Sequence, residues 1–450
     1  MKYVSTRGEA PVLGFADVLL TGLARDGGLY VPDEWPALPV IDAHRPYADV
    51  AAAVMAPYVD GALEFDEFHA LVAEAYASFD EPDVCSVVEL GDGLWLLELF
   101  HGPTLAFKDM ALQLVGRLFD YELARRGERA TIVVATSGDT GSAAIEACVG
   151  RARVAIVVLH PAGRVSEVQR RQMTTGDAPN VHNVAVEGTF DDCQDLVKAM
   201  FADEHFREET ALSAMNSINW ARVMAQIPYY VWAAGRIGRC AFGVPTGNFG
   251  NVLAGWVAAR TGLPVAQLVV GSNRNDILAR WLDTGVLEAR DVVPTLSPSM
   301  DIQISSNLER LLFERLGRDG AAVRELMAAF RATGRAEAPS DPIFTGASFD
   351  DGATLAEIAR VYRDTGRLID PHTAVGVAAA RARRDSLDPI VCLATAHPAK
   401  FPDAVEQATG VRPALPNRLA DLLERPERYE TVPNDLATLK SFILAVVRPS

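Results

Sequence analysis

A lysine at the start of a helical segment is the first residue of this sequence that could do chemistry. Lys108 follows a turn signal at 102–103 and precedes an amphipathic run at 110–118, which places it at or near a helix N-terminus. Its charge opposes the helix dipole there, and the residues at 105–107 are apolar. Lys108 is therefore either a solvated surface lysine or an amine kept neutral enough to form a Schiff base with an aldehyde cofactor. This stretch alone leaves both interpretations open.

A loop rich in glycine and asparagine follows a short apolar run at 241–244. It reads PTGNFGN at 245–251 and leads into a predicted helix at 252–260. Glycines let the backbone approach a ligand and turn successive N–H groups inward, and the helix adds its positive end. The loop predicts an anion cradle, most simply for a phosphate, although it matches neither the Walker loop nor the dinucleotide GxGxxG pattern. An ordinary strand-to-helix turn is the alternative.

A second loop, TSGDTGS at 136–142, brings hydroxyl groups and glycines to the start of another helix. Such donors suit a carboxylate or a phosphate, which makes Thr136, Ser137 and Thr140 candidate substrate-binding residues. The same residue types are also the preferred helix caps. Taken by itself, this loop is explained as well by capping.

A third loop, ATAHPAK at 394–400, follows the last predicted strand. Thr395 could offer its hydroxyl to a ring nitrogen, whereas a lone histidine such as His397 is more often structural. A lysine, a phosphate cradle and donor-rich loops at one edge of a sheet would together suit a cofactor with an aldehyde, a phosphate and a heteroaromatic ring. Pyridoxal 5′-phosphate (PLP) is that molecule.

The elements that must position these loops are short apolar runs rich in β-branched residues. They lie at 131–135, 154–159, 181–186, 241–244, 265–270 and 390–394. Continuous apolar strands that alternate with helices predict an α/β fold with parallel sheet buried on both faces, whose ligands bind at the carboxyl ends of the strands. Helical patterns at 15–24 and 65–78 predict a small, mainly helical N-terminal region. The tail at 413–450 is typical of helices joined by proline turns.

The composition excludes several functional classes. The 42 Lys and Arg against 59 Asp and Glu give a formal net charge of −17, which argues against a nucleic acid or an anionic membrane as partner. The five cysteines form no CxxC pair and no metal-like cluster, so we expect free thiols in a reducing cytoplasm and no metal. The N-terminus lacks a signal-peptide core, and the longest apolar run, at 50–59, is too short to span a bilayer. A cytoplasmic protein without a membrane partner is expected.

Motifs spread over nearly the whole chain resemble those of the threonine synthases, PLP enzymes of the tryptophan-synthase-β-like family. They include HGPTLAFKDMALQ at 101–113, ATSGDTGSAA at 135–144, NSINWAR at 216–222, PTGNFGN at 245–251 and LATAHPAKFP at 393–402. The resemblance implies PLP fold type II, with two parallel-sheet α/β domains that enclose the cofactor. It places an N-terminal region at 1–95, a smaller α/β domain with the lysine at 96–235, and a larger one with the phosphate loop at 236–450.

The resemblance also implies a role for each candidate residue. Lys108 would be the catalytic lysine that binds PLP as a Schiff base, Thr395 would hydrogen-bond the pyridine nitrogen, and Asp139 would lie near the phenolic oxygen. The cofactor phosphate would be held by Gly247, Asn248, Phe249, Gly250 and Asn251. The segment that resembles the substrate-phosphate site contains Ser166, Arg170 and Arg171. Arginine supplies bidentate cationic donors to a phosphate, and a solvated helix face is the alternative for this segment.

The activity implied by the resemblance is that of a carbon–oxygen lyase acting on a phosphate. O-phospho-L-homoserine and water would become L-threonine and phosphate, by γ-elimination and then β-addition of water, as the last step of threonine biosynthesis. A related fold type II lyase or dehydratase, or a non-catalytic ligand-binding relative, is the alternative. The presence of Lys108 and of the 245–251 loop counts against the non-catalytic relative. A monomer and a homodimer both remain open.

Overall fold

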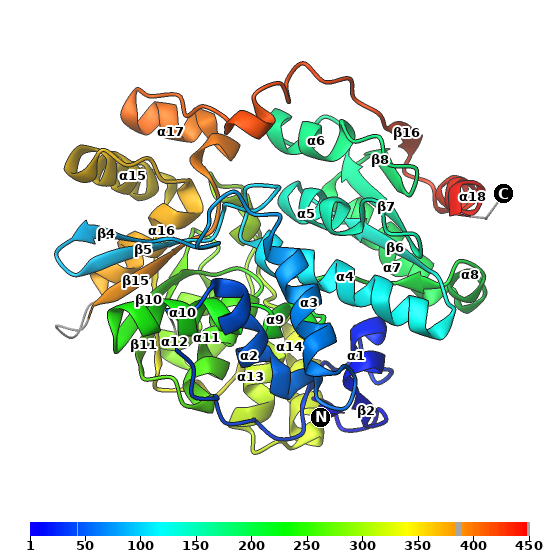
Figure 1. The fold of residues 1–450 in the computed structure, drawn as a ribbon, viewed down its shortest axis with the longest axis horizontal. Helices are drawn as coiled ribbons and strands as arrows, with labels where there is room; N and C mark the ends of the chain where they lie inside the picture. The colour runs from blue at the N-terminus through cyan, green and yellow to red at the C-terminus, as the bar shows by residue number, and fades with distance from the viewer. Residues whose placement is uncertain (43, 384–388, 448–450) are drawn as a thin grey trace. The chain divides into compact units, whose positions relative to one another are not determined.

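The structure, a computed structural model, describes residues 1–42, 44–383 and 389–447. These residues form two compact units, each with its own sheet of wholly or mostly parallel strands and with helices (Figure 1). The first unit comprises Met1–Val18, Leu23–Ala111 and Ser217–Pro413, and the second comprises Leu19–Gly22, Leu112–Asn216 and Ala414–Ser450. The boundaries at 95/96 and 235/236 expected from the sequence differ from these limits and stay a prediction about domains.

The first unit is built on a six-stranded sheet with the order β14-β11-β10-β15-β5-β4. Its strands are β4 (Val87–Gly91), β5 (Leu94–Glu98), β10 (Cys240–Pro245), β11 (Val265–Ser272), β14 (Phe344–Ser348) and β15 (Ile390–Ala394). Neighbouring strands are parallel, except that β4 and β5 form an antiparallel pair. The strands predicted at 241–244, 265–270 and 390–394 are confirmed, whereas the sequence analysis missed β4, β5 and β14.

The second unit is built on a five-stranded parallel sheet with the order β16-β8-β7-β6-β9. Its strands are β6 (Ala130–Ala135), β7 (Val154–Pro161), β8 (Val181–Glu187), β9 (Leu212–Ser213) and β16 (Glu430–Pro433). The predicted strands at 131–135, 154–159 and 181–186 are confirmed. The tail was expected to be helical only, and that expectation was wrong for β16. This strand lies at the edge of the sheet, where a proline such as Pro433 is tolerated.

Helices cover both sheets (Figure 1). Those of the first unit are α2 (Tyr47–Val59), α3 (Phe65–Tyr76), α9 (Trp220–Met224), α10 (Ile227–Ile237), α11 (Gly250–Thr261), α12 (Ile277–Thr284), α13 (Leu308–Arg315), α14 (Gly320–Thr333), α15 (Asp351–Thr365), α16 (Pro371–Ala382) and α17 (Pro402–Thr409). Those of the second unit are α5 (Asp139–Cys148), α6 (Glu167–Thr174), α7 (Phe190–Ala202), α8 (Glu204–Glu209) and α18 (Leu436–Val447). Helices α1 (Phe15–Thr21) and α4 (Lys108–Arg126) have residues in both units.

The N-terminal region combines helices with a small sheet that the sequence analysis did not predict. Strands β1 (Lys2–Ser5), β2 (Leu13–Gly14) and β3 (Tyr30–Pro32) pair antiparallel. A further antiparallel pair in the first unit joins β12 (Val286–Glu288) to β13 (Arg335–Glu337).

Local sequence explains where several helices begin and how closely they pack. The Asp370 carboxylate accepts the N–H groups of His372 and Thr373, and a proline occupies the first turn, so α16 begins with both a preferred cap and a preferred first residue. In the second unit, a Cβ on Gly116 of α4 would lie 2.2 Å from the Ala147 carbonyl oxygen of α5. Glycine is therefore required for the close contact of these two helices.

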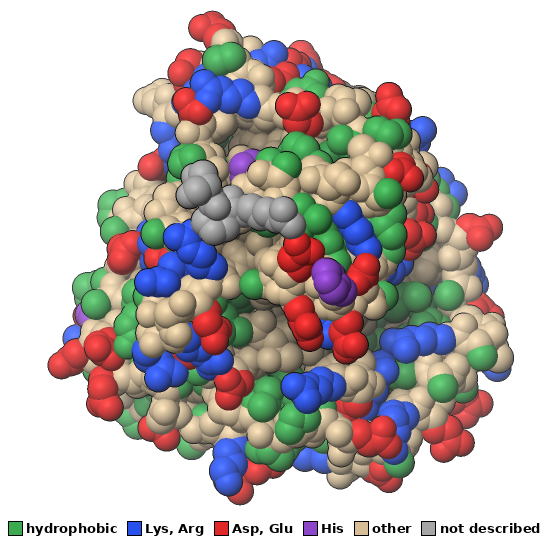
Figure 2. All heavy atoms as spheres, turned by 90° about the vertical axis from the view of Figure 1, so that its right-hand side faces the viewer, with side chains coloured by type: hydrophobic (Ala, Val, Ile, Leu, Met, Phe, Trp, Pro, Cys, Tyr) green, Lys and Arg blue, Asp and Glu red, His purple; other side chains and the backbone are tan. Residues whose placement is uncertain are grey.

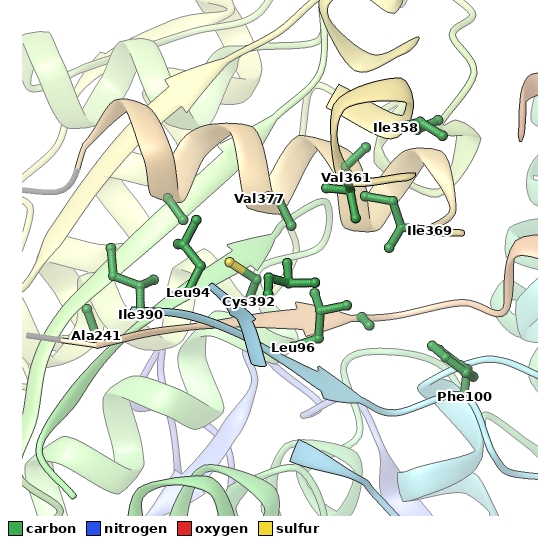
Figure 3. Packing of buried hydrophobic residues seen from close by; sticks show 14 residues of the cluster. Leu94, Leu96, Phe100, Ala241, Ile358, Val361, Ile369, Val377, Ile390 and Cys392 are labelled. Atoms are coloured by element: carbon green, nitrogen blue, oxygen red, sulfur yellow. The ribbon is translucent and has the colours of Figure 1, made fainter. Parts of the chain in front are cut away.

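The core that supports the first sheet lies between its strands and helices α15 and α16 (Figure 3). Leu94 and Leu96 of β5 and Cys392 of β15 meet Val377 of α16 and Val361 of α15, and each is at most 2% exposed. Burial of such side chains contributes roughly 1.5–3 kcal/mol each relative to an exposed position. The strand ends of this sheet are thus held by a well-packed interior.

The cysteines, the helices and the surface charges can be compared with the classes of function that the composition argued against. All five cysteines are buried free thiols. Within the described ranges, no helix combines the length and apolarity needed to cross a membrane. On the face shown in Figure 2, acidic and basic side chains are interspersed.

Candidate active site

Lys108 is the first residue of α4 in the first unit, as the turn signal predicted. Its side chain is largely buried, and its Nζ lies 5.0 Å from the centre of the Phe107 ring. The turn before it is held by Asp109, whose carboxylate accepts from the Thr104 backbone N–H at 2.7 Å and hydroxyl at 2.8 Å. Leu105 adopts the left-handed conformation at φ +62°, so the chain reverses sharply just before the lysine.

Backbone hydrogen bonds tie this turn to the third loop of the sequence analysis. The Phe107 N–H donates to the Thr395 carbonyl at 2.8 Å, and the His397 N–H donates to the Leu105 carbonyl at 3.0 Å. Ala106 and Ala396 form the β-bridge between them. Lys108 and Thr395 therefore lie on or next to two segments that are hydrogen-bonded to each other. The structure thus brings together two residues that were predicted from separate motifs.

The first residues of α16 hold Thr395 in place by hydrogen bonds. Its N–H donates to the Thr373 hydroxyl at 3.2 Å, and that hydroxyl is hydrogen-bonded to the Asp370 carboxylate. The other carboxylate oxygen of Asp370 lies 2.7 Å from His372 Nδ1, and His372 Nε2 accepts from the Ser299 N–H. Since Nε2 accepts, Nδ1 carries the proton and donates it to Asp370.

The predicted phosphate loop connects β10 to α11 in the same unit. Its carbonyl groups are taken up by the neighbouring segment: Ser305 Oγ donates to the Gly247 carbonyl at 2.6 Å, and the Asn307 N–H donates to the Asn248 carbonyl at 3.1 Å. Within the part of the chain that the structure describes, no acceptor is found for the backbone N–H groups of 247–251. Because the carbonyls are held on one side, these N–H groups are available on the other, at the positive end of α11.

Two backbone features explain why this loop needs its particular residues. A Cβ on Gly247 would lie 2.6 Å from the Ser299 carbonyl oxygen and 3.3 Å from Met300 Cα, so only glycine fits. Phe249 adopts the left-handed conformation at φ +63°, which is a strained position for an aromatic residue. Such strain persists only where the surrounding structure enforces it.

The side chain of Asn251 shows whether the loop is suited to bind a phosphate. Its Oδ1 lies 2.6 Å from the Tyr229 hydroxyl and 2.9 Å from the Tyr230 hydroxyl. Burial raises the pKa of both hydroxyls well above the usual value, so they stay protonated and donate. The amide nitrogen of Asn251 is buried without a hydrogen-bond partner. A buried orphan donor beside open N–H groups fits an anion such as the cofactor phosphate.

The loop at 136–142 lies in the second unit and is organised differently. Thr136 Oγ1 accepts from the N–H groups of Gly138 and Gly141, each at 2.9 Å. Asp139 Oδ1 accepts from the Gln169 amide at 2.8 Å. The remaining hydroxyl candidates, Ser137 and Thr140, are exposed and half-buried, respectively.

The predicted substrate-phosphate segment forms the start of α6 in the second unit. Ser166 caps this helix and donates to Gln169 Oε1 at 2.8 Å. Arg170 makes a bidentate pair with Glu427 at 2.8 and 2.9 Å, and Arg171 pairs with Glu167 at 3.2 Å. Both arginines therefore already have carboxylate partners, and their substrate-binding role stays a prediction.

His397 has a structural role, as its lone position suggested. Its Nδ1 accepts from the Ala399 N–H and caps a short 3-10 helix at Pro398–Lys400. Burial lowers the pKa of His397 to about 4, with a smaller contribution from the neighbouring His101. The imidazole is therefore neutral at physiological pH. Among the described residues, no cluster of histidine, cysteine, aspartate or glutamate side chains could hold a metal.

The sequence analysis missed the residues that support the site from behind. Asp370, His372 and Thr373 hold Thr395, while Ser305 and Asn307 hold the phosphate loop. The Asp-Pro pair at 370–371 is a recognisable helix-start signal, but it says nothing of what the helix touches. No local pattern distinguished the other residues from ordinary polar ones.

Three family models match the chain. The model described as pyridoxal-phosphate dependent enzyme matches residues 86–396. Those described as threonine synthase N terminus and threonine synthase, C-terminal match residues 2–76 and 373–443. Together they confirm the resemblance found in the sequence motifs.

Individual relatives match over the whole length of the chain. A threonine synthase of Pseudomonas aeruginosa is 53% identical, with 98% of each chain covered. The crystal structure of a PLP-bound threonine synthase of Brucella melitensis matches with a TM-score of 0.97 and 51% identity, covering 100% of both chains. The yeast threonine synthase structure matches with a TM-score of 0.93 and 36% identity, over 99% of this chain and 98% of that one. The predicted PLP fold type II is thereby confirmed.

Proposed function

We propose the function of this chain from one premise: it belongs to the threonine synthase family of PLP-dependent enzymes. It converts O-phospho-L-homoserine and water into L-threonine and inorganic phosphate. The observation that carries the proposal is the full-length identity of 53% to a threonine synthase. The loop at 247–251 lies in the same unit as Lys108. Its open N–H groups and the buried amide of Asn251 fit the cofactor phosphate that this chemistry needs.

The first unit would hold the cofactor. The loop at 247–251 would bind its phosphate, the Thr395 hydroxyl would donate to the ring nitrogen, and Lys108 Nζ would be the point of covalent attachment. When bound, PLP supplies an aldehyde that bonds to amines and a conjugated ring that takes up electrons. Because the Thr395 hydroxyl is a neutral donor, it leaves the ring nitrogen unprotonated, which favours elimination over transamination.

Lys108 would also move the protons of the reaction. Its amine, when it is not bonded to the cofactor, would remove the proton from the α-carbon of the substrate and later return it. The sharp turn at Leu105 and the bonds from Asp109 to Thr104 fix the start of α4, so that the base is presented at one position.

The substrate-binding candidates lie in the second unit. The hydroxyls of Thr136, Ser137 and Thr140 would donate to the carboxylate or phosphate of the substrate. Within the second unit, the Gln169 amide donates to the Asp139 carboxylate and orients it. The role of Asp139 near the phenolic oxygen of the cofactor, which the resemblance implies, stays a prediction. Ser166, Arg170 and Arg171 would contribute to the phosphate site only if the bonds to Glu427 and Glu167 rearrange.

The decisive experiment measures phosphate and threonine released from O-phospho-L-homoserine in one reaction of the PLP-loaded protein. Equal amounts of the two products are expected. Phosphate with a keto acid in place of threonine would assign the protein to the related lyases. A yellow protein that releases no phosphate would have another substrate, and one that stays colourless with added PLP would be a non-catalytic relative.

The site of action and the assembly are part of the same proposal. We place the enzyme in the cytoplasm, as a monomer or a homodimer, acting on a small molecule with no nucleic-acid or membrane partner. Light scattering of the purified protein measures its mass directly. A mass above that of two chains of 48.5 kDa would contradict the assembly proposed.

A further inference from the structure

A buried cation lies behind the phosphate loop in the first unit. Arg310 of α13 is 1% exposed. Its Nε donates to the Tyr30 carbonyl at 2.9 Å, its Nη2 to the Ile218 carbonyl at 2.6 Å, and its Nη1 to Asn307 Oδ1. Within the described ranges, no carboxylate lies within 4.0 Å of the guanidinium, although Arg310 is hydrogen-bonded on three sides.

Asn307 connects this guanidinium to the loop. While Oδ1 accepts from Arg310, Nδ2 donates to the Asn248 carbonyl at 3.1 Å and to the Ser217 carbonyl at 3.0 Å. The Asn307 backbone N–H donates to the same Asn248 carbonyl at 3.1 Å. A Cβ on Gly250 would lie 3.3 Å from Asn307 Nδ2. One amide side chain therefore separates the buried cation from the first residue of α11.

Burial of the Arg310 charge is costly, and the charge of the neighbouring Glu309 offsets that cost only in part. Removal of the guanidinium from water lowers the pKa of Arg310 to about 9, so the group is still charged at neutral pH. A buried charge is disfavoured unless hydrogen bonds and an opposite charge compensate it. Here the hydrogen bonds come from neutral acceptors, and the charge of an anion in the loop would be little screened in this interior.

Three titratable groups on neighbouring segments have partners of their own. Glu309, next to Arg310, accepts a bidentate pair from Arg7. Asp301 accepts from Thr295 and from asparagine amides, and burial raises the pKa of its carboxyl. His372 is hydrogen-bonded to Asp370 and accepts from the Ser299 N–H. Among the described residues, Arg310 thus has no carboxylate in direct contact, and Glu309 acts on it only through its charge.

We propose that Arg310 is a positioning residue for the cofactor phosphate. Acting through Asn307, it holds the Asn248 carbonyl away from the anion, so that the loop presents its N–H groups, and it favours the doubly charged form of the phosphate. The inference rests on the proposed assignment of the phosphate to the 247–251 loop.

The test compares two arginines of the same helix. Arg310→Met removes the buried charge at similar volume, Arg310→Lys keeps the charge without the planar fork, and Arg315→Met removes a half-exposed arginine that pairs with Asp341. Cofactor affinity is measured by titrating the apo protein with PLP. Arg310→Met should bind PLP about ten- to a hundredfold more weakly, a loss of the size seen when the outer-shell partners of metal ligands are removed. Arg310→Lys should bind with intermediate affinity, and Arg315→Met with the wild-type affinity.

The ³¹P resonance of the bound phosphate separates this role from a merely structural one. In the wild-type protein it should keep the dianion position across pH values around the second phosphate pKa of about 6. In Arg310→Lys it should stay there, whereas in Arg310→Met it should move toward the monoanion position as the pH falls. A wild-type resonance and wild-type affinity in Arg310→Met would overturn the inference.

Two further variants keep the test decisive if Arg310→Met does not fold or if the loop does not bind the phosphate. Asn307→Asp has the same shape and places a carboxylate beside Arg310, so it should also weaken PLP binding, and unchanged binding would contradict the proposal. Asn251→Ala removes the buried donor of the loop itself. If Asn251→Ala weakens PLP binding and Arg310→Met does not, the inference alone fails. If both bind normally, the loop assignment fails with it.

Discussion

Two strand-to-helix turns of similar composition differ in whether their backbone N–H groups are hydrogen-bonded within the turn. The turn after β10, at 246–251, and the turn after β6, at 136–142, both begin with threonine and contain glycines and short polar residues. In the first, the carbonyls are bonded to Ser305 and Asn307 and the N–H groups remain open. In the second, Thr136 Oγ1 accepts two of the N–H groups itself.

The difference follows from the direction of one hydroxyl. Thr246 Oγ1 donates back to the Val244 carbonyl at 2.8 Å, behind the turn, whereas Thr136 Oγ1 faces into its own turn as an acceptor. A turn that caps itself is already satisfied, and a turn whose carbonyls are held from outside keeps its donors for a ligand. Composition alone therefore cannot identify an anion site.

The largest expected effect concerns Lys108, the residue that we propose as the attachment point of the cofactor in the first unit. Lys108→Ala should abolish turnover, because it removes both the attachment point and the base. It should also abolish the visible absorbance of covalently bound PLP. Absorbance spectra and phosphate release measure the two losses, with the exposed Lys198→Ala as the matched control. Retained turnover would sink the assignment of Lys108.

The next effect compares one glycine from each turn. Gly247→Ala places a Cβ 2.6 Å from a backbone oxygen, whereas Gly138→Ala meets the Gln169 side chain at 2.6 Å and has a φ of +143°. Both changes should cost stability, on the order of 1–3 kcal/mol. Only Gly247→Ala should also weaken PLP binding. Equal losses of PLP affinity in the two variants would break the distinction between the turns.

Much of this arrangement was predictable, because it depends on neighbours in the chain. β-Branched runs identified six strands, turn residues placed Lys108 at a helix start, and glycines marked the 245–251 loop. Strands such as β14 (FTGAS) and β16 (ETVP) were missed because their sequences are short and polar, and pairing with a longer strand decides their conformation.

The supporting contacts could not be predicted, since they join residues distant in sequence. Asn307 lies 59 residues from Asn248, and Arg170 lies 257 residues from Glu427. Nothing in the α6 sequence showed that Arg170 would pair with Glu427 of the tail. The direction of the Thr136 hydroxyl likewise depends on the backbone around it and not on its identity.

A third prediction tests the two threonines directly. Thr136→Val removes the acceptor of two buried N–H groups and should lower the free energy of unfolding by about 1–3 kcal/mol for each. Thr246→Val removes one donor to a backbone carbonyl and should cost only about 1 kcal/mol. Urea denaturation measures both, and PLP affinity should be nearly unchanged in Thr136→Val. If Thr136→Val lost as much PLP affinity as Gly247→Ala, the turn at 136–142 would also take part in phosphate binding, and the distinction between the two turns would be wrong.

The smallest expected effect concerns the ion pair that engages Arg170 in the second unit. The bonds from Arg170 lower the pKa of the Glu427 carboxyl from its usual 4.5. Since the folded state favours the ionised form, the stabilisation is complete above that usual value and is lost as the pH falls through the lower folded pKa. The difference in unfolding free energy between wild type and Glu427→Gln should therefore be constant near neutrality and shrink below about pH 4.5.

The same pair decides whether Arg170 is a structural residue or a substrate-binding one. If it binds the substrate phosphate, Arg170→Ala should raise KM for O-phospho-L-homoserine more than it weakens PLP binding, and Glu427→Gln should lower KM because a competing carboxylate is gone. If the pair is only structural, both variants should lose a little stability, below about 1 kcal/mol, and leave KM unchanged. Kinetics of the two single variants and the double variant distinguish these outcomes, because only a shared phosphate site makes their effects on KM non-additive.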